Sequence, residues 1–493
     1  MAKGIDVKRV LSVASEAVPL IKTGGLADVV GALPAALAPM GWDMRVILPA
    51  YPGVIANLNK GSKAVWASGD LFGGPATLIL GQCGEMQVMA LDAPHLYART
   101  GGPYSDGQGD YADNAERFAA LSWVAAEIAR HGTQEATPWH PDIVHAHDWQ
   151  AALTPAYLSY AGAQAIPSVL TIHNIAFQGR FSPTKMAAMR LPAQRFTPDG
   201  FEFWGDISTL KAGLVSAHAI TTVSPRYADE LMRPEFGLGL EGVLQYRADV
   251  MSGILNGIDK QVWDPENDPE VKPFSAAKLA GKKGNRAALI AEFSLDANAI
   301  TGPLMILVSR LTSQKGIDMV PGAISEFLAN GGGLIVLGSG DRWAEAMVQD
   351  LSARYPGRVG NWIGYDEGLS HRMFAGGDAV LIPSRFEPCG LTQLYGMRYG
   401  CVPIVAAVGG LADTVIDATP AACAAHAATG IVFQPVDTLG LRQALRRLTA
   451  LWNDPKEWAA TVKRGMKTDW GWEPSAHRYV ALYEATIRRG TDA

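Results

Sequence analysis

Cysteine is scarce in this chain, with four residues among 493 and no CxxC pair. That scarcity argues against a zinc ribbon or a thioredoxin-like redox motif, and it favours a reducing compartment. Long hydrophobic runs are also missing, because no stretch approaches the ~18 apolar residues of a membrane span. The N-terminal residues lack a continuous apolar core and a small-residue cleavage site, so we expect no signal peptide. We therefore predict a cytoplasmic protein.

An excess of either charge is absent too. A net charge of −6 gives no support for a sequence-independent nucleic-acid binder, which needs a basic surface. The sequence contains no HExxH, GxSxG or GxxxxGK[ST] motif, and no DxD pair of the kind that clamps a metal-diphosphate in one large class of sugar-nucleotide transferases. A hydrophobic content of 48% with 18% charged residues is typical of an ordinary globular protein.

One GxGxxG does occur, at Gly237, Gly239 and Gly242. It follows the helical-looking stretch SPRYADELMR rather than a strand, so it lacks the context of a dinucleotide-binding loop. We expect a glycine-rich loop at the edge of a cleft instead.

Glycine is plentiful, at 53 residues, which suits tight turns between strands and helices. Short β-rich runs alternate with longer amphipathic segments, the pattern of a parallel sheet. The predicted strands are 9–15, 44–50, 86–92, 143–147, 168–173 and 219–224, then 304–310, 332–340, 359–365, 378–384 and 402–407. A polar, proline-bearing connector, DPENDPEVKPF, separates the two series. The sequence thus predicts two doubly wound domains with a boundary near 255–262, a ligand cleft between them, and a last helix from about 470 to 489 with Val480, Leu482, Tyr483 and Ile487 on its apolar side.

The phrase GGLAD occurs twice, from Gly24 and from Gly409. The two strand series begin at Arg9 and Leu304, so the repeat is not a duplication in register. We interpret it as local reuse of one loop design, with a lysine, Lys22, before the first copy only.

Polar residues follow two strands of the second series. Arg310 and Lys315 lie five apart across a turn, so both cations can reach one anion, although a solvated loop would look the same. Glu387 precedes a helix predicted to begin near Gly390, whose free N–H groups and positive end suit a phosphate. A carboxylate there suits sugar hydroxyls, or it is simply a charge at a helix N-terminus. Cys389 could be a reactive thiol, but we interpret it as a packing residue in the wall of the site.

Two consecutive strand ends of the first series also carry polar clusters. Asp148 and Trp149 follow one strand, and His173 and Asn174 follow the next. A lone histidine is more often a satisfied core group, but two clusters at neighbouring strand ends favour a cleft. Asn256, in NGID, is either a turn residue or a side chain at the hinge.

Together, KTGGLADVVGALP, HDWQAAL, TIHNIAFQG, NGID, SRLTSQKG and SRFEPCGLTQLYGMRYG resemble the bacterial glycogen synthase and plant starch synthase family, from about Val10 to Leu482. The resemblance implies the GT-B fold of two Rossmann-like domains. Residues 1–255 would form the domain on the glucan acceptor side and 256–469 the domain on the nucleotide-sugar donor side. Residues 470–493 would form a C-terminal helix that crosses back to the N-terminal domain. The family resemblance also implies a retaining glucosyltransferase that moves glucose from ADP-glucose to the non-reducing end of an α-1,4-glucan, with no metal, no other cofactor, no nucleic acid and no membrane.

The resemblance also implies roles for single residues. It assigns the donor-site lysine to Lys22, with Glu16 and Asp28 nearby and Gly25 close to the sugar. It assigns the phosphate pair to Arg310 and Lys315, and the sugar-binding acid to Glu387. The remaining matches are a histidine beside the glucose, a cleft aspartate, a hinge asparagine, helix-end amides and a tyrosine near the donor: His173, Asp148, Asn256, Gly390, Leu391, Thr392 and Tyr104.

Three alternatives stay open. Another GT-B transferase, such as a sucrose synthase-like or UDP-glucose-dependent enzyme, would share the fold. A phosphorylase would need pyridoxal phosphate and a Schiff-base lysine that the sequence does not reveal. A non-catalytic glucan-binding protein would lack transfer activity.

Overall fold

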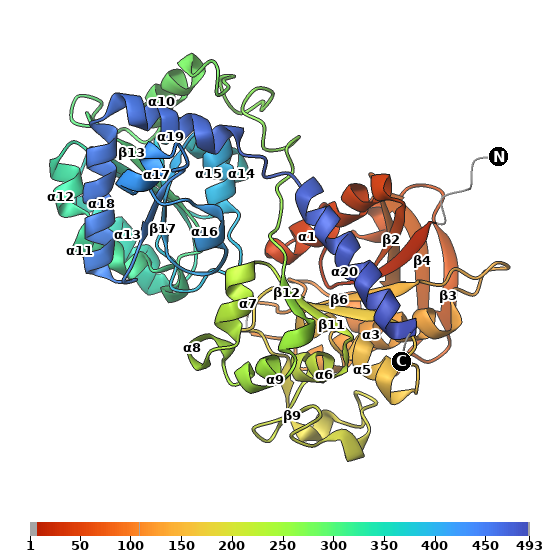
Figure 1. The fold of residues 1–493 in the computed structure, drawn as a ribbon. Coiled ribbons are helices and arrows are strands. Elements are labelled where there is room, and N and C mark those ends of the chain that lie inside the picture. The colour runs from red at the N-terminus through yellow and green to blue at the C-terminus, as the bar shows by residue number, and fades with distance from the viewer. Residues whose placement is uncertain (1–6, 108, 492–493) are drawn as a thin grey trace. The chain divides into compact units, whose positions relative to one another are not determined.

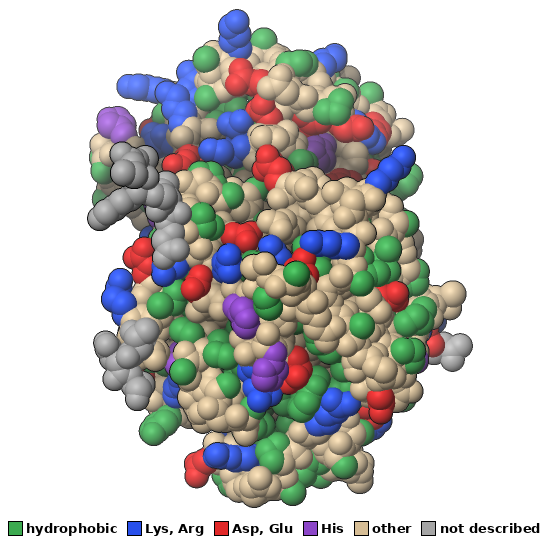
Figure 2. Space-filling view, turned by 90° about the vertical axis from the view of Figure 1, so that its right-hand side faces the viewer, with side chains coloured by type: hydrophobic (Ala, Val, Ile, Leu, Met, Phe, Trp, Pro, Cys, Tyr) green, Lys and Arg blue, Asp and Glu red, His purple; other side chains and the backbone are tan. Residues whose placement is uncertain are grey.

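A computed structural model describes residues 7–107 and 109–491. By its internal contacts the chain divides into two compact units, one up to Gly257 together with Trp472 onward, the other Ile258–Gly471. Each unit is built around its own sheet, mainly parallel in the first unit and fully parallel in the second (Figure 1). On the face shown in Figure 2, Lys and Arg side chains are interspersed with Asp and Glu, as the small net charge leads one to expect.

The first unit contains a nine-stranded sheet in the order β12-β11-β7-β6-β1-β2-β5-β4-β3. Pairing is parallel except along β3, β4 and β5, which form an antiparallel edge. The strands are β1 Lys8–Val13, β2 Trp42–Pro49, β3 Lys63–Ser68, β4 Ala76–Cys83, β5 Met86–Asp92, β6 Ile143–His147, β7 Ser168–Ile172, β11 Ala219–Thr222 and β12 Met251–Gly253. Counted along the parallel strands, the order reverses between β1 and β6, which makes that point the topological switch where ligands of such sheets bind.

Helices cover this sheet, and a small antiparallel sheet lies beside it. The helices are α1 Gly25–Leu37, α2 Pro94–Tyr97, α3 Asn114–His131, α4 Asp148–Ala151, α5 Leu153–Tyr160, α6 Thr209–Ser216, α7 Pro225–Leu231, α8 Pro234–Gly237, α9 Glu241–Tyr246 and α20 Glu473–Thr491, and the small sheet is β8 Arg180–Phe181, β10 Asp206–Ser208 and β9 Glu202–Phe203. In Figure 1 helix α20 runs beside α1. Its buried stripe is Ala476, Tyr479 and Tyr483, which pack on strands of the large sheet, whereas Val480, Leu482 and Ile487 are only partly buried.

The second unit contains a six-stranded, all-parallel sheet in the order β15-β14-β13-β16-β17-β18. Its strands are β13 Leu304–Val308, β14 Gly333–Gly338, β15 Val359–Ile363, β16 Ala379–Ile382, β17 Val402–Ala406 and β18 Ile431–Phe433, and its helices are α10 Ala280–Glu292, α11 Val320–Ala323, α12 Ser325–Ala329, α13 Arg342–Arg354, α14 Glu367–Gly376, α15 Thr392–Arg398, α16 Gly409–Thr414, α17 Pro420–Ala424, α18 Thr438–Trp452 and α19 Pro455–Lys467. This is the 3-2-1-4-5-6 order of a Rossmann sheet, with its switch point between β13 and β16.

The continuous apolar runs become buried strands for a simple reason. Strands covered by helices on both faces must be apolar on both, and all of Leu304–Leu307 and Gly333–Gly338 are buried. The predicted runs at 304–310 and 378–384 extend past the observed strands, because their last residues are polar loop residues beyond the ladder. Helix α15 begins at Thr392, two residues later than predicted, since Gly390 has a φ of 71° and cannot continue a right-handed helix.

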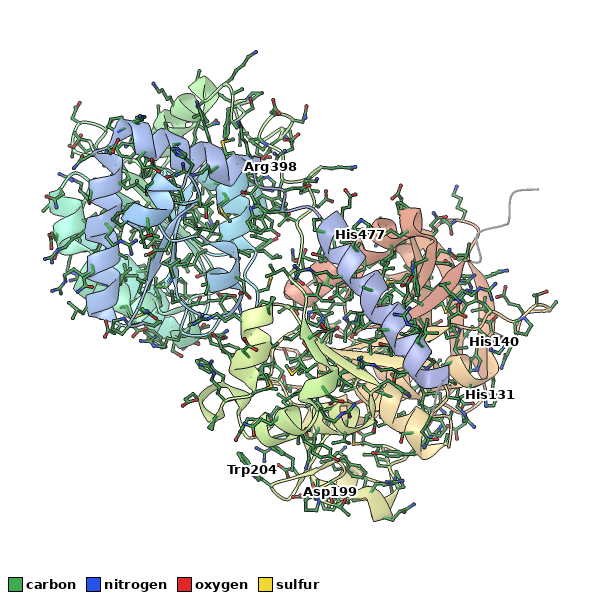
Figure 3. All side chains as sticks on the ribbon, in the orientation of Figure 1. His131, His140, Asp199, Trp204, Arg398 and His477 are labelled. Atoms are coloured by element: carbon green, nitrogen blue, oxygen red, sulfur yellow. The ribbon has the colours of Figure 1, made fainter. Side chains whose placement is uncertain are left out.

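The GxGxxG segment runs from the last residue of α8 into α9, so it joins two helices and does not connect a strand to a helix. A Cβ on Gly239 would lie 2.7 Å from Cζ2 of Trp204, a residue at the turn between β9 and β10 (Figure 3). The glycine thus lets a loop pack against an indole ring, and no dinucleotide needs to be invoked.

None of the helices among residues 7–107 and 109–491 is long and apolar enough to cross a bilayer.

Candidate active site

In the first unit, polar residues gather at the switch point of the sheet. Asp148 follows β6 with a φ of 54°, a conformation that costs a non-glycine residue free energy and is concentrated at functional sites. Its Oδ1 accepts hydrogen bonds from the backbone N–H groups of His173 at 2.7 Å and Asn174 at 3.4 Å. Burial raises the pKa of this carboxyl to about 7, against the two backbone donors and with a further upward contribution from Glu16. Asp148 therefore titrates near neutrality and ties the ends of β6 and β7 together.

Glu16, after β1, holds the glycine-rich loop. Its carboxylate accepts from both the backbone N–H and the hydroxyl of Thr23, the latter at 2.6 Å, and from the hydroxyl of Tyr104. Burial raises the pKa of Tyr104 well above its ordinary value, and the Glu16 charge adds to the shift. Tyr104 thus stays a hydrogen-bond donor, and both residues act on the shape of the loop that contains Lys22.

That loop leaves open space beside its glycines. Lys22 Nζ lies 2.7 Å from Asp28 Oδ1, and the lysine side chain is 47% exposed. A Cβ added to Gly24 or Gly25 would meet no atom within 4 Å. A ligand can therefore approach the backbone here, with an ammonium group at hand. Asn256 lies after β12, and its Oδ1 accepts no hydrogen bond within the described part of the chain.

In the second unit, Lys315 and Glu387 meet at the switch point between β13 and β16. Lys315 Nζ donates to Glu387 Oε2 at 2.6 Å, and the hydroxyl of Ser384 donates to the same oxygen at 2.7 Å. Both charged side chains are largely buried, at 16% and 10% exposure. The lysine expected beside a phosphate and the acid expected beside a sugar are thus paired with each other.

Arg310 is the unpaired cation of this group. It is exposed, and among the described residues no carboxylate or other acceptor binds its guanidinium. It follows β13, the strand that pairs with β16.

The second GGLAD copy has a different task from the first. The N–H of Gly410 donates to the carbonyl oxygens of Glu387 and Pro388, at 3.2 and 3.1 Å. A Cβ on Gly409 would lie 2.0 Å from the Glu387 oxygen, and one on Gly410 would lie 2.3 Å from the Cys389 oxygen. Gly409 and Gly410 thus pack directly against the backbone of the loop that contains Glu387, whereas Gly24 and Gly25 leave space that a ligand can occupy.

Two hollows in the second unit differ in relevance. A cavity of about 20 Å³ is bordered by Lys315, Ser384, Glu387, Gly390, Thr392 and Gln393. A larger hollow of about 230 Å³ contains none of the predicted site residues, and its Arg372 is neutralised by Glu270 and Glu292. The predicted site residues of this unit therefore border the smaller cavity.

The predicted residues therefore form two groups, one in each unit. Glu16, Asp148, His173 and Tyr104 are joined through hydrogen bonds and electrostatics at the first switch point, and Lys315, Glu387 and Gly390 lie together at the second. Ser384 was not predicted as a site residue, because a serine in a loop carries no signal of its own until the fold places it against Glu387. Within the described residues, no group of three or more His, Cys, Asp or Glu side chains could hold a metal ion.

Comparison with known proteins agrees with this geometry. The starch synthase catalytic domain family matches residues 9–246, and glycosyl transferases group 1 matches residues 295–464. The glycogen synthase of Cereibacter sphaeroides is 57% identical over 97% of this chain and 98% of its own. Glycogen synthase 1 of Rhizobium meliloti is 52% identical over 98% of this chain and its full length.

Solved structures point the same way. The catalytic domain of starch synthase IV from Arabidopsis thaliana, bound to ADP and acarbose, superposes with a TM-score of 0.86 at 31% identity, covering 98% of this chain and 99% of that one. A sucrose-phosphate synthase from Thermosynechococcus elongatus, at 18% identity and a TM-score of 0.59 over 98% of this chain and 100% of that one, shares the fold alone. Two Rossmann-like sheets in this order are the GT-B fold, and the chain belongs to the glycogen synthase and starch synthase family of glucosyltransferases.

Proposed function

We propose that the chain transfers glucose from ADP-glucose to the non-reducing end of an α-1,4-glucan such as glycogen, with retention at the anomeric carbon. The observation that carries this is the buried Lys315–Glu387 pair at a Rossmann switch point, with the exposed Arg310 after the neighbouring strand β13; cations suit a diphosphate there, and a carboxylate suits sugar hydroxyls. The four free cysteines of the chain support a location in a reducing compartment, the cytoplasm.

In this proposal, Arg310 and Lys315 bind the diphosphate of the donor, assisted by backbone amides at Gly390, Leu391 and Thr392. At an effective dielectric of about 20, one charge pair ~4 Å apart interacts by about 4 kcal/mol before desolvation. Lys315 would exchange part of its contact with Glu387 for the phosphate, which frees the carboxylate to accept from sugar hydroxyls. Lys22 would add positive charge from the first unit, with the backbone of Gly25 close to the sugar. Asn256 would lie at the hinge.

The negative charge that develops on the diphosphate during the reaction would lie beside Arg310, Lys315 and Lys22. As the C1–O bond to phosphate breaks, the diphosphate gains negative charge and the sugar becomes oxocarbenium-like. Fixed cations stabilise that developing charge, and stabilisation of this kind is commonly the main source of an enzyme's rate enhancement. A new bond then forms between C1 and the acceptor oxygen on the same face, and the acceptor proton passes to a phosphate oxygen of the leaving ADP. Asp148 and His173 would border the sugar from the first unit.

Donor competition tests the substrate. With glycogen as acceptor, we expect ADP release from ADP-glucose and much slower turnover of UDP-glucose. Equal or faster turnover of UDP-glucose would assign the chain to a different donor class, and absence of release from both would leave only glucan binding.

Substitution tests the phosphate assignment. Arg310→Ala or Lys315→Ala should lower kcat by about 10²-fold or more, because each removes a charge that acts in the transition state. Arg354→Ala is the control, since this arginine pairs with Asp350 on the surface of α13 and should leave kcat unchanged. Near-normal turnover in the Arg310 and Lys315 variants would contradict the assignment.

A further inference from the structure

His173, in the polar group of the first unit, is the last of three neighbouring buried histidines. The proposed reaction uses only His173 and leaves His145 and His147 without a role. His145 and His147 belong to β6, two residues apart, so their side chains share a face of the sheet. Both are fully buried, and His173, just after β7, is 8% exposed. The His145 and His147 rings lie 4.1 Å apart between centroids, and His147 and His173 lie 5.2 Å apart.

Hydrogen bonds join these rings to neighbouring hydroxyls. His147 Nδ1 lies 2.9 Å from His173 Nε2, and His147 Nε2 lies 3.2 Å from the hydroxyl of Ser12 on β1. His145 is fixed separately, by Tyr483 of α20 at 2.7 Å and by Thr171 of β7 at 2.6 Å. Both ring nitrogens of His147 are thus engaged, one of them by His173 itself.

The proton positions on His147 and His173 depend on each other, because Ser12, His147 and His173 are connected by successive hydrogen bonds. Burial lowers the pKa of His145 and His173 to about 3, and that of His147 well below its ordinary value. Each ring is therefore neutral near pH 7, with one donating and one accepting nitrogen. If Ser12 donates to His147 Nε2, then His147 Nδ1 donates to His173 Nε2, and His173 Nδ1 carries the proton. If Ser12 accepts, the order reverses and His173 Nδ1 is bare.

His173 Nδ1 is the free end of these hydrogen bonds. Among residues 7–107 and 109–491 no group forms a hydrogen bond with this nitrogen, while the backbone N–H of His173 is held by Asp148 at 2.7 Å. The ring is thus anchored at its Nε2 and at its backbone, and Nδ1 remains for a ligand.

We propose that His147 is a positioning residue for His173: its Nδ1 fixes the ring orientation and the tautomer of His173, so that a single donor or acceptor faces the sugar. The proposal rests on the proposed function in assigning the ligand of His173 as a sugar. A histidine that can flip or change tautomer presents the wrong group part of the time, and such an error is costly in catalysis even when the fold is intact.

Two substitutions of His147 separate its two hydrogen bonds. The amide of His147→Asn can occupy the place of ring Nδ1 and keep the bond to His173, whereas the longer His147→Gln reaches the place of Nε2 and keeps only the bond to Ser12. Both replace a buried ring by an amide, so both should lose similar thermal stability. We expect His147→Gln to lower kcat by about 10- to 100-fold, by analogy with the loss of a partner that orients a metal-ligating histidine. We expect His147→Asn to retain most of kcat.

A readout without substrate completes the experiment. In protein labelled with ¹⁵N-histidine, the two ring nitrogens of His173 should report one neutral tautomer in the wild type and a mixture in His147→Gln. His218→Gln is the control, because His218 bonds to Ser168 and Gln164 at the other end of the sheet and should change neither readout.

Unchanged His173 nitrogen signals in His147→Gln, or equal kcat in the two His147 variants, would overturn the positioning role. Failure of the wild type to transfer glucose would overturn the proposed function instead, and the nitrogen signals would still decide whether His147 holds His173.

Discussion

At the residue scale, Asp148 combines three properties that are costly for stability. It is buried, its backbone is left-handed, and its pKa is raised from 3.8 to about 7. In the unfolded chain the carboxyl loses its proton near pH 4, whereas in the folded chain it keeps the proton until about pH 7. The folded state therefore loses stability as the pH rises from about 4 to 7, by up to about 4 kcal/mol at pH 8.

Asp148→Asn removes this pH-dependent cost, since the amide oxygen can still accept from the His173 N–H. Relative to wild type, the variant should gain more unfolding free energy at pH 8 than at pH 5, by about 2.5 kcal/mol, while its turnover falls. Urea unfolding at the two pH values measures the difference. Asp229→Asn, at an exposed position on α7, should show no such pH dependence. An equal change for Asp148→Asn at both pH values would contradict the raised pKa.

The polar residues at strand ends could be located from the sequence because each follows a continuous apolar run. Their partners could not. Whether Lys315 faces a phosphate or Glu387, and whether Glu16 holds Thr23, depends on loop geometry that no local pattern encodes. The histidines of HAHDWQ look like core residues until Ser12 and His173 are placed beside His147.

At the element scale, two identical five-residue phrases begin two helices that do different work. Short β-rich runs predicted most of the parallel strands, but β3, β4 and the three-residue strands β12 and β18 were missed. Many residues of β3 and β4 are partly exposed at the edge of the sheet, so their hydrophobic signal is weak, and three residues are too few to show a pattern. The GGLAD repeat shows the opposite case, a strong local signal whose role is set by its neighbours.

Alanine substitutions should reveal that difference. Gly410→Ala would drive its Cβ to 2.3 Å from a backbone oxygen, so we expect a loss of about 1–3 kcal/mol in unfolding free energy. Gly25→Ala meets no atom and should leave stability unchanged or raise it by up to about 1 kcal/mol, while the KM for the donor rises. Thermal unfolding and donor titration measure the two effects. A destabilised Gly25→Ala, or a stable Gly410→Ala, would show that the two loops had been assigned the wrong way round.

At the scale of the whole molecule, the chain leaves the first unit at Gly257 and returns to it at Trp472. The last helix is therefore part of the core of a unit whose other residues lie more than two hundred positions earlier. Tyr483 is the main link: its ring lies 5.4 Å from that of Trp42 and its hydroxyl bonds to His145. Nothing in the periodicity of α20 indicates which sheet it covers, since an apolar stripe fits any apolar face.

Tyr483→Ala should therefore destabilise one unit. Loss of a large buried ring costs about 3–5 kcal/mol, and hydrogen exchange should show it as faster exchange across residues 7–257, while residues 258–471 keep their protection. Leu448→Ala, at a fully buried position on α18 of the second unit, is the matched opposite and should expose 258–471 alone. Tyr483→Phe keeps the ring but leaves His145 Nδ1 without its partner, so a smaller loss of about 1–3 kcal/mol is expected in the same segment. If Tyr483→Ala released both units together, the two would unfold as one cooperative body, and the assignment of α20 to the first core alone would be wrong.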